Sequence, residues 1–125
     1  MPLVTICSLA PSDPEAIRRM VIDVRDAGSE ALKCSPDNIW VMFHTVPPGY
    51  YVQGLAPATE PQAESHPPTV IVRAQVGRTH AERTDLVAAV ATAVGKGLSI
   101  PAENVWVHYQ EMRSEDVWFK GHWSA

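Results

Sequence analysis

The sequence predicts an α/β (α+β) fold in which two tandem βαβ units form a four-stranded sheet with two helices on one face. The first observation is an internal repeat, since residues 35–41 read SPDNIWV and residues 100–107 read IPAENVWV, about 66 positions later. The second is that a helical apolar pattern precedes each copy, and the third is that a β-rich run precedes each helical pattern. Strand, helix and strand in this order predict a parallel pair with a right-handed crossover in each unit.

The first predicted unit spans residues 1–54, and its first strand is LVTICSL at 3–9. Ser12 followed by Glu15 matches a capping box, and Pro14 suits the first turn of a helix. The apolar positions of this helix define one face: Ile17, Met20, Val21, Val24, Ala31 and Leu32. NIWVMFHT at 38–45 is predicted as the second strand, and the turn at 47–49 predicts a short hairpin that ends at Gly54.

The second predicted unit spans residues 68–125 and repeats this order. TVIVRAQV at 69–76 is its first strand, Gly77-Arg78 is the turn, and Thr79 with Glu82 forms a second capping box. The helix face consists of Leu86, Val87, Val90, Val94 and Leu98, and the last strand is VWVHYQEM at 105–112. Residues 55–67 are rich in Pro, Ala and Glu and are predicted as a linker between the units of a single domain.

The composition is that of an ordinary globular chain with 125 residues and a net charge of -4. There is no basic excess to indicate a nucleic-acid partner, and no apolar run reaches the roughly 18 residues of a membrane span. The N-terminus lacks the features of a secretory signal, so we expect a cytoplasmic protein. Cys7 and Cys34 have no metal-ligand spacing, which favours two reduced structural thiols and no metal site.

The predicted sheet needs cover on both faces. VTI, VIV and IWVMF are near-continuous apolar runs, whereas a sheet with one solvated face shows an alternating pattern. Because the two helices cover one face, we expect the other face to be covered in an oligomer.

A chain that opens Met-Pro and duplicates a βαβ unit resembles the tautomerase superfamily, whose members use an amino-terminal proline. Residues 68–112 resemble the single-unit 4-oxalocrotonate tautomerases, through the opening proline and strand, Gly77-Arg78-Thr79, Glu82 and the return strand that ends Glu111-Met112. The whole chain looks more like the double-length cis-3-chloroacrylic acid dehalogenase and malonate semialdehyde decarboxylase groups. This resemblance implies a tautomerase/MIF-like fold, a homotrimer and an isomerase that needs no cofactor.

Several positions depart from these groups. Trp40 and Trp106 stand where the single-unit tautomerases have a substrate-binding arginine. The positions of the dehalogenase residues that assist water addition hold Gly28, Gln75, His108 and Phe119. Asn38 replaces the decarboxylase aspartate, although Trp118 and Phe119 approximate its C-terminal Trp and Phe. Most of the machinery for water addition is therefore missing.

Pro2 is the predicted catalytic base or acid. If Met1 is removed, the Pro2 nitrogen is a secondary amine, and burial with a nearby arginine would lower its pKa from about 8 toward neutrality. If Met1 stays, this nitrogen is a tertiary amide without basicity. Pro68 matches Pro2 in the repeat but lies inside the chain, so it cannot be a base.

Two further residues are candidate catalytic groups. Arg78 follows a strand and precedes a helix, where it can hold a carboxylate together with helix amides. His108 can act as a second acid or base, because its ordinary pKa allows either state near neutrality. The alternatives are a solvated loop arginine and a hydrogen-bonded strand histidine.

The candidate substrate-binding residues are Arg73 and five aromatic residues: Trp40, Tyr51, Trp106, Trp118 and Phe119. Aromatic side chains can form an apolar wall for a flat substrate. The sequence favours packing for the two strand tryptophans and an interface role for the aromatic tail at 117–123, with substrate contact as the alternative in both cases.

The predicted function is proton transfer on a small 2-oxo or enol carboxylic acid. Pro2 acts on the carbon next to the carbonyl, Arg78 holds the anion, and aromatic groups exclude water. The alternatives are hydration, dehalogenation or decarboxylation of a three-carbon acid on the same scaffold, or a catalytically silent trimeric binding protein.

Overall fold

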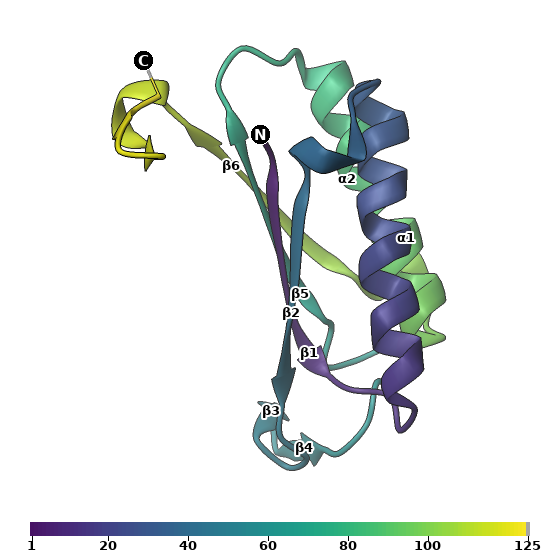
Figure 1. Cartoon of the computed structure of the whole chain (residues 1–125). Coiled ribbons are helices and arrows are strands. Elements are labelled where there is room, and N and C mark those ends of the chain that lie inside the picture. The colour runs from purple at the N-terminus through teal and green to yellow at the C-terminus, as the bar shows by residue number, and fades with distance from the viewer. Residues whose placement is uncertain (125) are drawn as a thin grey trace.

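The computed structural model describes residues 1–124, in which a four-stranded sheet carries two long helices on one face (Figure 1). The strand order is β2-β1-β5-β6, formed by Trp40–Val46, Leu3–Leu9, Thr69–Gln75 and Trp106–Met112. β1 and β2 are parallel, as are β5 and β6, whereas the two central strands β1 and β5 are antiparallel. The predicted fold of two βαβ units in one sheet is therefore confirmed.

The core lies between the sheet and the helices α1 (Pro14–Leu32) and α2 (His80–Leu98), which also pack on each other. Inward residues alternate along the central strands, as expected for strands with one face on a core. The core residues are Val4, Ile6, Met20, Val24, Val70, Val72, Leu86, Val90, Val94, Leu98 and Ile100. A Cβ on Gly97 would lie 2.5 Å from Met20 Cγ, so this glycine allows the close approach of α2 to α1.

The sequence repeat is also a structural repeat. Each helix ends at a residue in the left-handed conformation, Lys33 (φ 54°) or Ser99 (φ 57°), and a 3₁₀ turn follows at 36–38 or 102–104. The Trp40 N–H then donates to the Pro2 carbonyl, and the Trp106 N–H donates to the Pro68 carbonyl, both at 3.0 Å. Equivalent residues of the two units therefore lie at opposite ends of the sheet.

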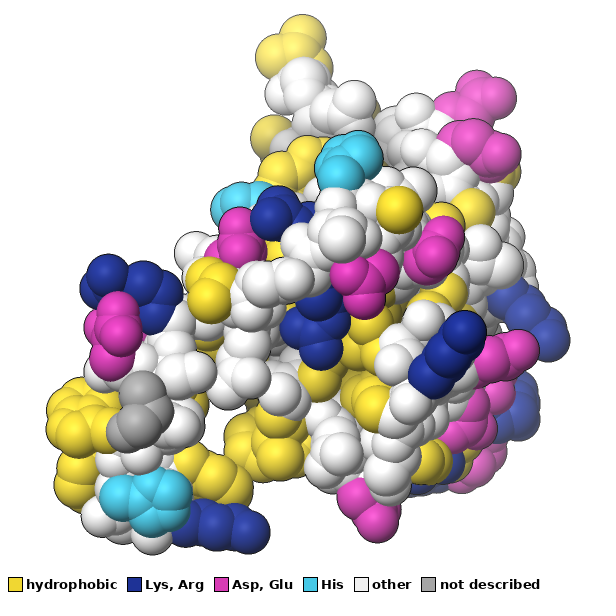
Figure 2. All heavy atoms as spheres, turned by 90° about the horizontal axis from the view of Figure 1, so that it is seen from above, with side chains coloured by type: hydrophobic (Ala, Val, Ile, Leu, Met, Phe, Trp, Pro, Cys, Tyr) yellow, Lys and Arg dark blue, Asp and Glu magenta, His cyan; other side chains and the backbone are white. Residues whose placement is uncertain are grey.

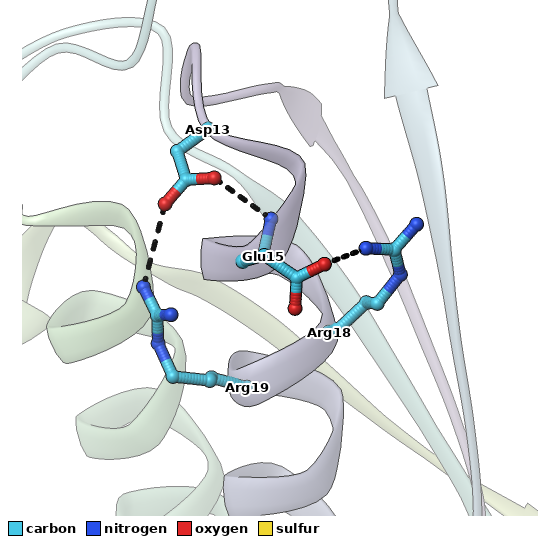
Figure 3. A network of polar contacts seen from close by, with 4 residues as sticks. All are labelled: Asp13, Glu15, Arg18 and Arg19. Carbon is cyan, nitrogen blue, oxygen red and sulfur yellow. Dashed lines mark hydrogen bonds and ion pairs between the residues drawn. The ribbon is translucent and has the colours of Figure 1, made fainter.

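The caps of the two helices differ from each other and, in one case, from the prediction. Asp13 caps α1 by accepting a hydrogen bond from the Glu15 N–H at 3.0 Å, and its second oxygen lies 3.6 Å from Arg19 (Figure 3). Glu15 pairs with Arg18. The predicted capping box of Ser12 and Glu15 is wrong, because Pro14 takes a first-turn position and the cap is the residue before it. The capping box of Thr79 and Glu82 is confirmed.

A small hairpin follows each edge strand. β3 (Tyr51–Gln53) pairs with β4 (Ala56–Ala58), and β7 (Trp118–Phe119) pairs with β8 (His122–Trp123). The first hairpin does not end at Gly54 as predicted, because Gly54 (φ 62°) lies in its turn and the chain continues into β4. The two hairpins lie at opposite ends of the sheet (Figure 1).

The sheet face opposite the helices is open. Trp40, Met42 and Trp106 lie on the edge strands with 41%, 46% and 52% of their surface exposed. No helix within residues 1–124 is long and apolar enough to cross a membrane.

Candidate active site

A cavity of about 350 Å³ lies between the N-terminal end of β1 and the C-terminal hairpin. Figure 2 looks onto this end of the molecule, where the hairpin projects from the body and hydrophobic side chains lie on both. The lining comes from the starts of β1 and β2, the ends of β5 and β6, and the hairpin: Met1, Leu3, Trp40, Gln75, Met112, Val117, Trp118, Phe119 and Ser124.

The cavity is largely apolar because the hairpin places its aromatic residues beside Trp40, at the start of β2. The Phe119 ring contacts Trp40 edge to face, with centroids 5.2 Å apart and planes at 71°. Trp118 contacts Trp123 in the same manner at 5.2 Å, across the two strands of the hairpin. Gln75 and Ser124 supply the polar side chains of the lining, and none of its side chains is charged.

The cavity lies beside the N-terminal amine and Arg78. Pro2 is buried at the start of β1, and the amine of Met1, which precedes it, has a lowered pKa. Burial is the larger cause, and the positive charge of Arg78 acts in the same direction, whereas the Cys34 thiol opposes both. Arg78 Nη1 donates to the Gln75 carbonyl at 3.3 Å, which holds the guanidinium at the end of β5.

Five predicted site residues therefore lie at this end of the sheet. They are Pro2, Arg78, Trp40, Trp118 and Phe119. Trp40, Trp118 and Phe119 line the cavity directly. Pro2 and Arg78 lie next to it, because Pro2 follows the lining residue Met1 in the chain and Arg78 is hydrogen-bonded to the lining residue Gln75.

Tyr51 and Trp106 lie at the opposite end of the sheet, within the same chain. The Tyr51 hydroxyl donates to the Pro67 carbonyl at 2.7 Å, and its ring meets His66 at 5.2 Å. Burial raises the pKa of Tyr51, and the nearby Cys7 adds to this shift. Trp106 is paired in register with Thr69 at the start of β5.

Arg73 and His108 lie on the open sheet face between the two ends. Arg73 Nε donates to Gln110 Oε1 at 2.9 Å on the neighbouring strand, although the backbone of Arg73 pairs with Leu3 of the cavity. The His108 ring contacts Trp106 at 5.9 Å and is paired in register with Ile71. Within one chain, neither residue joins the lining of the cavity.

Sequence reasoning did not identify Leu3, Met112 and Ser124 as lining residues. The repeat carried a usable signal, because the same offset that relates Trp40 to Trp106 relates Tyr51 to Val117 and hairpin residues 56–58 to residues 122–124. A hairpin at the C-terminus, and its place beside Pro2, follow from that correspondence.

The two cysteines lie apart, since Cys7 is close to Tyr51 and Cys34 is close to the N-terminal amine, and both are free thiols. In residues 1–124, no three His, Cys, Asp or Glu side chains are grouped as in a metal site.

No protein-family model and no curated protein sequence matches the chain. Solved structures match over nearly its whole length. The R7 fused 4-OT asymmetric trimer gives a TM-score of 0.85 at 16% identity over 98% of this chain and 95% of that one. Pt0534, solved after inactivation by 2-oxo-3-pentynoate, gives 0.82 at 21% identity over 96% and 93%. N1, a member of the cis-3-chloroacrylic acid dehalogenase family, gives 0.71 at 22% identity over 97% and 82%.

This likeness shows that the chain has the fold of the fused 4-OT and cis-3-chloroacrylic acid dehalogenase structures, as the sequence resemblance implied.

Proposed function

We propose that the chain belongs to the tautomerase superfamily and that the cavity beside Pro2 is a tautomerase site. It acts on a small 2-oxo or enol carboxylic acid and uses no cofactor. The observation that carries this proposal is the meeting of Pro2, the Arg78 guanidinium and an apolar cavity at one end of the sheet.

The proposed mechanism requires removal of Met1, which turns the Pro2 nitrogen into a secondary amine. Burial and the charge of Arg78 lower the pKa of the Met1 amine. On a Pro2 amine freed by removal of Met1, the same two causes would act in the same direction. The neutral amine takes a proton from the carbon next to the substrate carbonyl, giving an enolate. The resulting ammonium returns that proton at another position, so the amine is regenerated.

Two other parts of the site support this proton transfer. Arg78 binds the substrate carboxylate through charge-assisted hydrogen bonds and fixes the reacting carbon near the amine. The aromatic walls exclude water, which strengthens the electrostatic interactions with the enolate.

The assembly proposed for this chain is a homotrimer. The open sheet face carries exposed Trp40, Met42 and Trp106, and the R7 fused 4-OT structure is described as a trimer. The roles predicted for Tyr51, Arg73, Trp106 and His108, like the cytoplasmic location, stay predictions. Light scattering after size exclusion should give about three times the 13.7 kDa chain mass.

The test of the proposed function compares a free with a blocked Pro2. Intact mass spectrometry first verifies protein that lacks Met1, and a second form carries one glycine before Pro2. Both are assayed with enol acids of different size and charge, and circular dichroism checks that both are folded. The free form should turn over at least one enol acid, with kcat/KM about 100-fold or more above that of the blocked form.

Equal rates in the two forms, or no turnover by verified free Pro2, would disprove the proposed reaction. Retained Met1 in native protein would favour the silent binding protein instead. Titration of Pro2 separates proton abstraction from water addition or decarboxylation, because a base needs a pKa below the assay pH and an acid needs one above it.

A further inference from the structure

Two asparagines occupy equivalent places in the two units. Asn38 ends the 3₁₀ turn at 36–38, and Asn104 ends the turn at 102–104. The backbone N–H of each asparagine donates to the carbonyl of the residue three positions earlier, at 3.0 Å in both cases. Two residues later, a tryptophan N–H donates to the carbonyl of Pro2 in the first unit and of Pro68 in the second. The backbone therefore relates Asn38 to Pro2 as it relates Asn104 to Pro68.

The side chain of Asn104 shows what an amide at this place binds. Its Nδ2 donates to the Ser65 and Gln62 carbonyls, both at 2.9 Å. These two residues lie three and six positions before Pro68, in the linking segment that leads to the Pro68 nitrogen. At the closed end, neutral carbonyl oxygens on the approach to the proline nitrogen thus satisfy the asparagine amide.

At the Pro2 end these acceptors have no counterpart. The proposed function requires a free Pro2 amine, and in that form no residue precedes Pro2 to take the places of Ser65 and Gln62. The Asn38 side chain is exposed, and among the described residues its amide donates to no carbonyl equivalent to those two. Met1 is a lining residue of the cavity, so its removal enlarges the space at the Pro2 nitrogen. A ligand at this nitrogen can therefore extend toward the Asn38 amide.

The strand order places Asn38 and Arg78 on opposite sides of Pro2. β1 begins directly after Pro2 and lies between β2 and β5. Asn38 precedes β2, which is parallel to β1, whereas Arg78 follows β5, which is antiparallel to it. The start of β2 and the end of β5 therefore lie at the same end of the sheet. A ligand whose carboxylate binds Arg78 would pass the Pro2 nitrogen and direct its other end toward Asn38.

We propose that Asn38 is a ligand-binding residue of the site beside Pro2, and that its Nδ2 donates to a neutral carbonyl oxygen on the part of the ligand remote from Arg78. The inference rests on the proposed function for the free Pro2 amine and on the internal repeat for the hydrogen bond. Since Asn38 and Pro2 belong to the same unit, each chain of the proposed trimer has both groups. A hydrogen bond to a neutral acceptor changes a binding constant about three- to tenfold.

The binding experiment uses the full chain with verified free Pro2 and three oxo acids: 4-oxopentanoate, 5-oxohexanoate and 6-oxoheptanoate. Each is paired with the acid in which CH–CH₃ replaces the ketone carbonyl, namely 4-methylpentanoate, 5-methylhexanoate or 6-methylheptanoate. Isothermal titration calorimetry compares Asn38→Ala with the unmodified chain. The variant should weaken the tightest-binding oxo acid about three- to tenfold and its methyl partner less than twofold, which isolates the carbonyl contact as a double-mutant cycle does. Asn38→Asp, which keeps the shape but has no N–H donor, should weaken the oxo acid at least as much.

Asn104→Ala is the matched control from the second unit. It removes the two hydrogen bonds to the linking segment, so it should lower the urea midpoint of unfolding and leave the affinity for the oxo acid unchanged. Asn38→Ala should show the opposite pattern, with an unchanged midpoint and a weaker oxo acid. For an enol acid that carries such a carbonyl, Asn38→Ala should raise KM and leave kcat within about twofold.

The outcomes separate this role from the proposed reaction. Binding of an oxo acid that Asn38→Ala weakens selectively, without turnover of any enol acid, supports the role of Asn38 and disproves the tautomerase reaction. Turnover together with unchanged oxo-acid affinity in Asn38→Ala overturns the role and leaves the reaction standing. Failure of all three oxo acids to bind, or equal weakening of both members of a pair, also overturns it. A fall in assembly mass by light scattering for Asn38→Ala would assign the amide to a subunit contact instead.

Discussion

The two ends of the sheet have the same backbone arrangement, but a cavity is present at only one of them among the described residues. At one end Trp40 donates to the Pro2 carbonyl, at the other Trp106 donates to the Pro68 carbonyl, and a hairpin follows the edge strand in each case. The end at Pro2 has a cavity of about 350 Å³. At the other end Pro68 is fully buried, and His66 of the linking segment contacts the hairpin of β3 and β4.

The difference arises from a few side chains. Tyr51 occupies the repeat position of Val117, and its hydroxyl reaches the Pro67 carbonyl, whereas the shorter Val117 leaves space beside Met1. His66 also fixes the linking segment against the first hairpin. Its backbone N–H donates to Gln53, and its Nε2 lies 2.7 Å from the Ala56 carbonyl.

Asn104 holds the linking segment to the second unit by donating to the Gln62 and Ser65 carbonyls, both at 2.9 Å. The comparison indicates that side chains and the linking segment close one end of the duplicated scaffold, while the other end keeps a cavity.

The largest expected contrast is between the two prolines. Pro2→Ala should lower kcat/KM about 100-fold with little change in stability, because a primary amine replaces the ring amine beside the cavity. Pro68→Ala should leave activity per folded molecule unchanged but destabilise the fold by about 1–3 kcal/mol, through lost burial and a more flexible unfolded chain. Enzyme kinetics and urea unfolding on both variants test this, and equal activity losses would show that the ends are not specialised.

The second contrast concerns the cation at the open end. Arg78→Ala should lower kcat/KM about 10- to 100-fold, since hydrogen bonds to charged groups are worth about 1.5–3 kcal/mol. Its charge lowers the pKa of the neighbouring amine, so removal should raise that pKa and move the acid limb of the pH–rate profile to higher pH.

Arg19→Ala is the charge-matched control for Arg78→Ala, because Arg19 is exposed on α1 and lies 3.6 Å from Asp13. A profile that shifts equally in both variants would contradict a local effect of Arg78.

The third contrast compares glycines of the two helices. Gly97→Ala should destabilise by about 1–3 kcal/mol, because the new Cβ would lie 2.6 Å from Met20 Cβ, an atom that no side-chain rotation moves. Gly28→Ala should be nearly neutral, since its closest neighbour is the flexible end of Ile39 at 3.2 Å and alanine gains about 1 kcal/mol in helix propensity. Urea unfolding should rank the two, and similar values would mean that the helix contact adapts.

The fourth contrast exchanges features of the two ends. Val117→Tyr should place a ring in the cavity beside Met1 and weaken ligand binding about tenfold while the chain stays folded. Tyr51→Phe removes the hydrogen bond to Pro67 at the closed end and should cost about 0.5–1.5 kcal/mol of stability without changing ligand affinity. Calorimetric titration together with thermal unfolding distinguishes these results, and undiminished binding by Val117→Tyr would show that the hairpin adapts.

The smallest expected effect is at the capping box that only α2 has among the described helices. The Thr79 backbone and hydroxyl groups lower the pKa of Glu82, so its ionised form stabilises the fold. This contribution is present above the ordinary glutamate pKa of about 4.3 and is lost as the pH falls through the lowered value. Glu82→Gln should flatten the decline in stability between pH 5 and 3, and unchanged pH dependence would exclude the effect.

The fold could be predicted because the repeat is strong in the strands and helices. The predicted strand at 3–9 matches β1, and those at 38–45, 69–76 and 105–112 match β2, β5 and β6 to within one or two residues. The α1 cap was misplaced by one residue, because Ser12 and Asp13 are both good caps and Pro14 decides between them. The predicted first hairpin ended too early, at Gly54, because a glycine is equally typical of the turn inside a hairpin and of the loop after it.

The site could be predicted only in part. Pro2, Arg78, Trp40, Trp118 and Phe119 lie at one end of the sheet. Tyr51 and Trp106 lie at the other end of the sheet within one chain, because β1 pairs antiparallel with β5, and their predicted roles in substrate binding stay predictions. Local patterns do not show which ends of two repeated units meet, since that depends on how the two central strands pair.

The sequence by itself determined the duplicated βαβ units, their amphipathic helices and the apolar strands, because short-range periodicity and caps specify such elements. Tertiary structure decided which hairpin lies over which proline and which of two equivalent ends stays open. The physical reason is that a cavity depends on side-chain volume, and here Tyr51 fills at one end the space that Val117 leaves empty at the other.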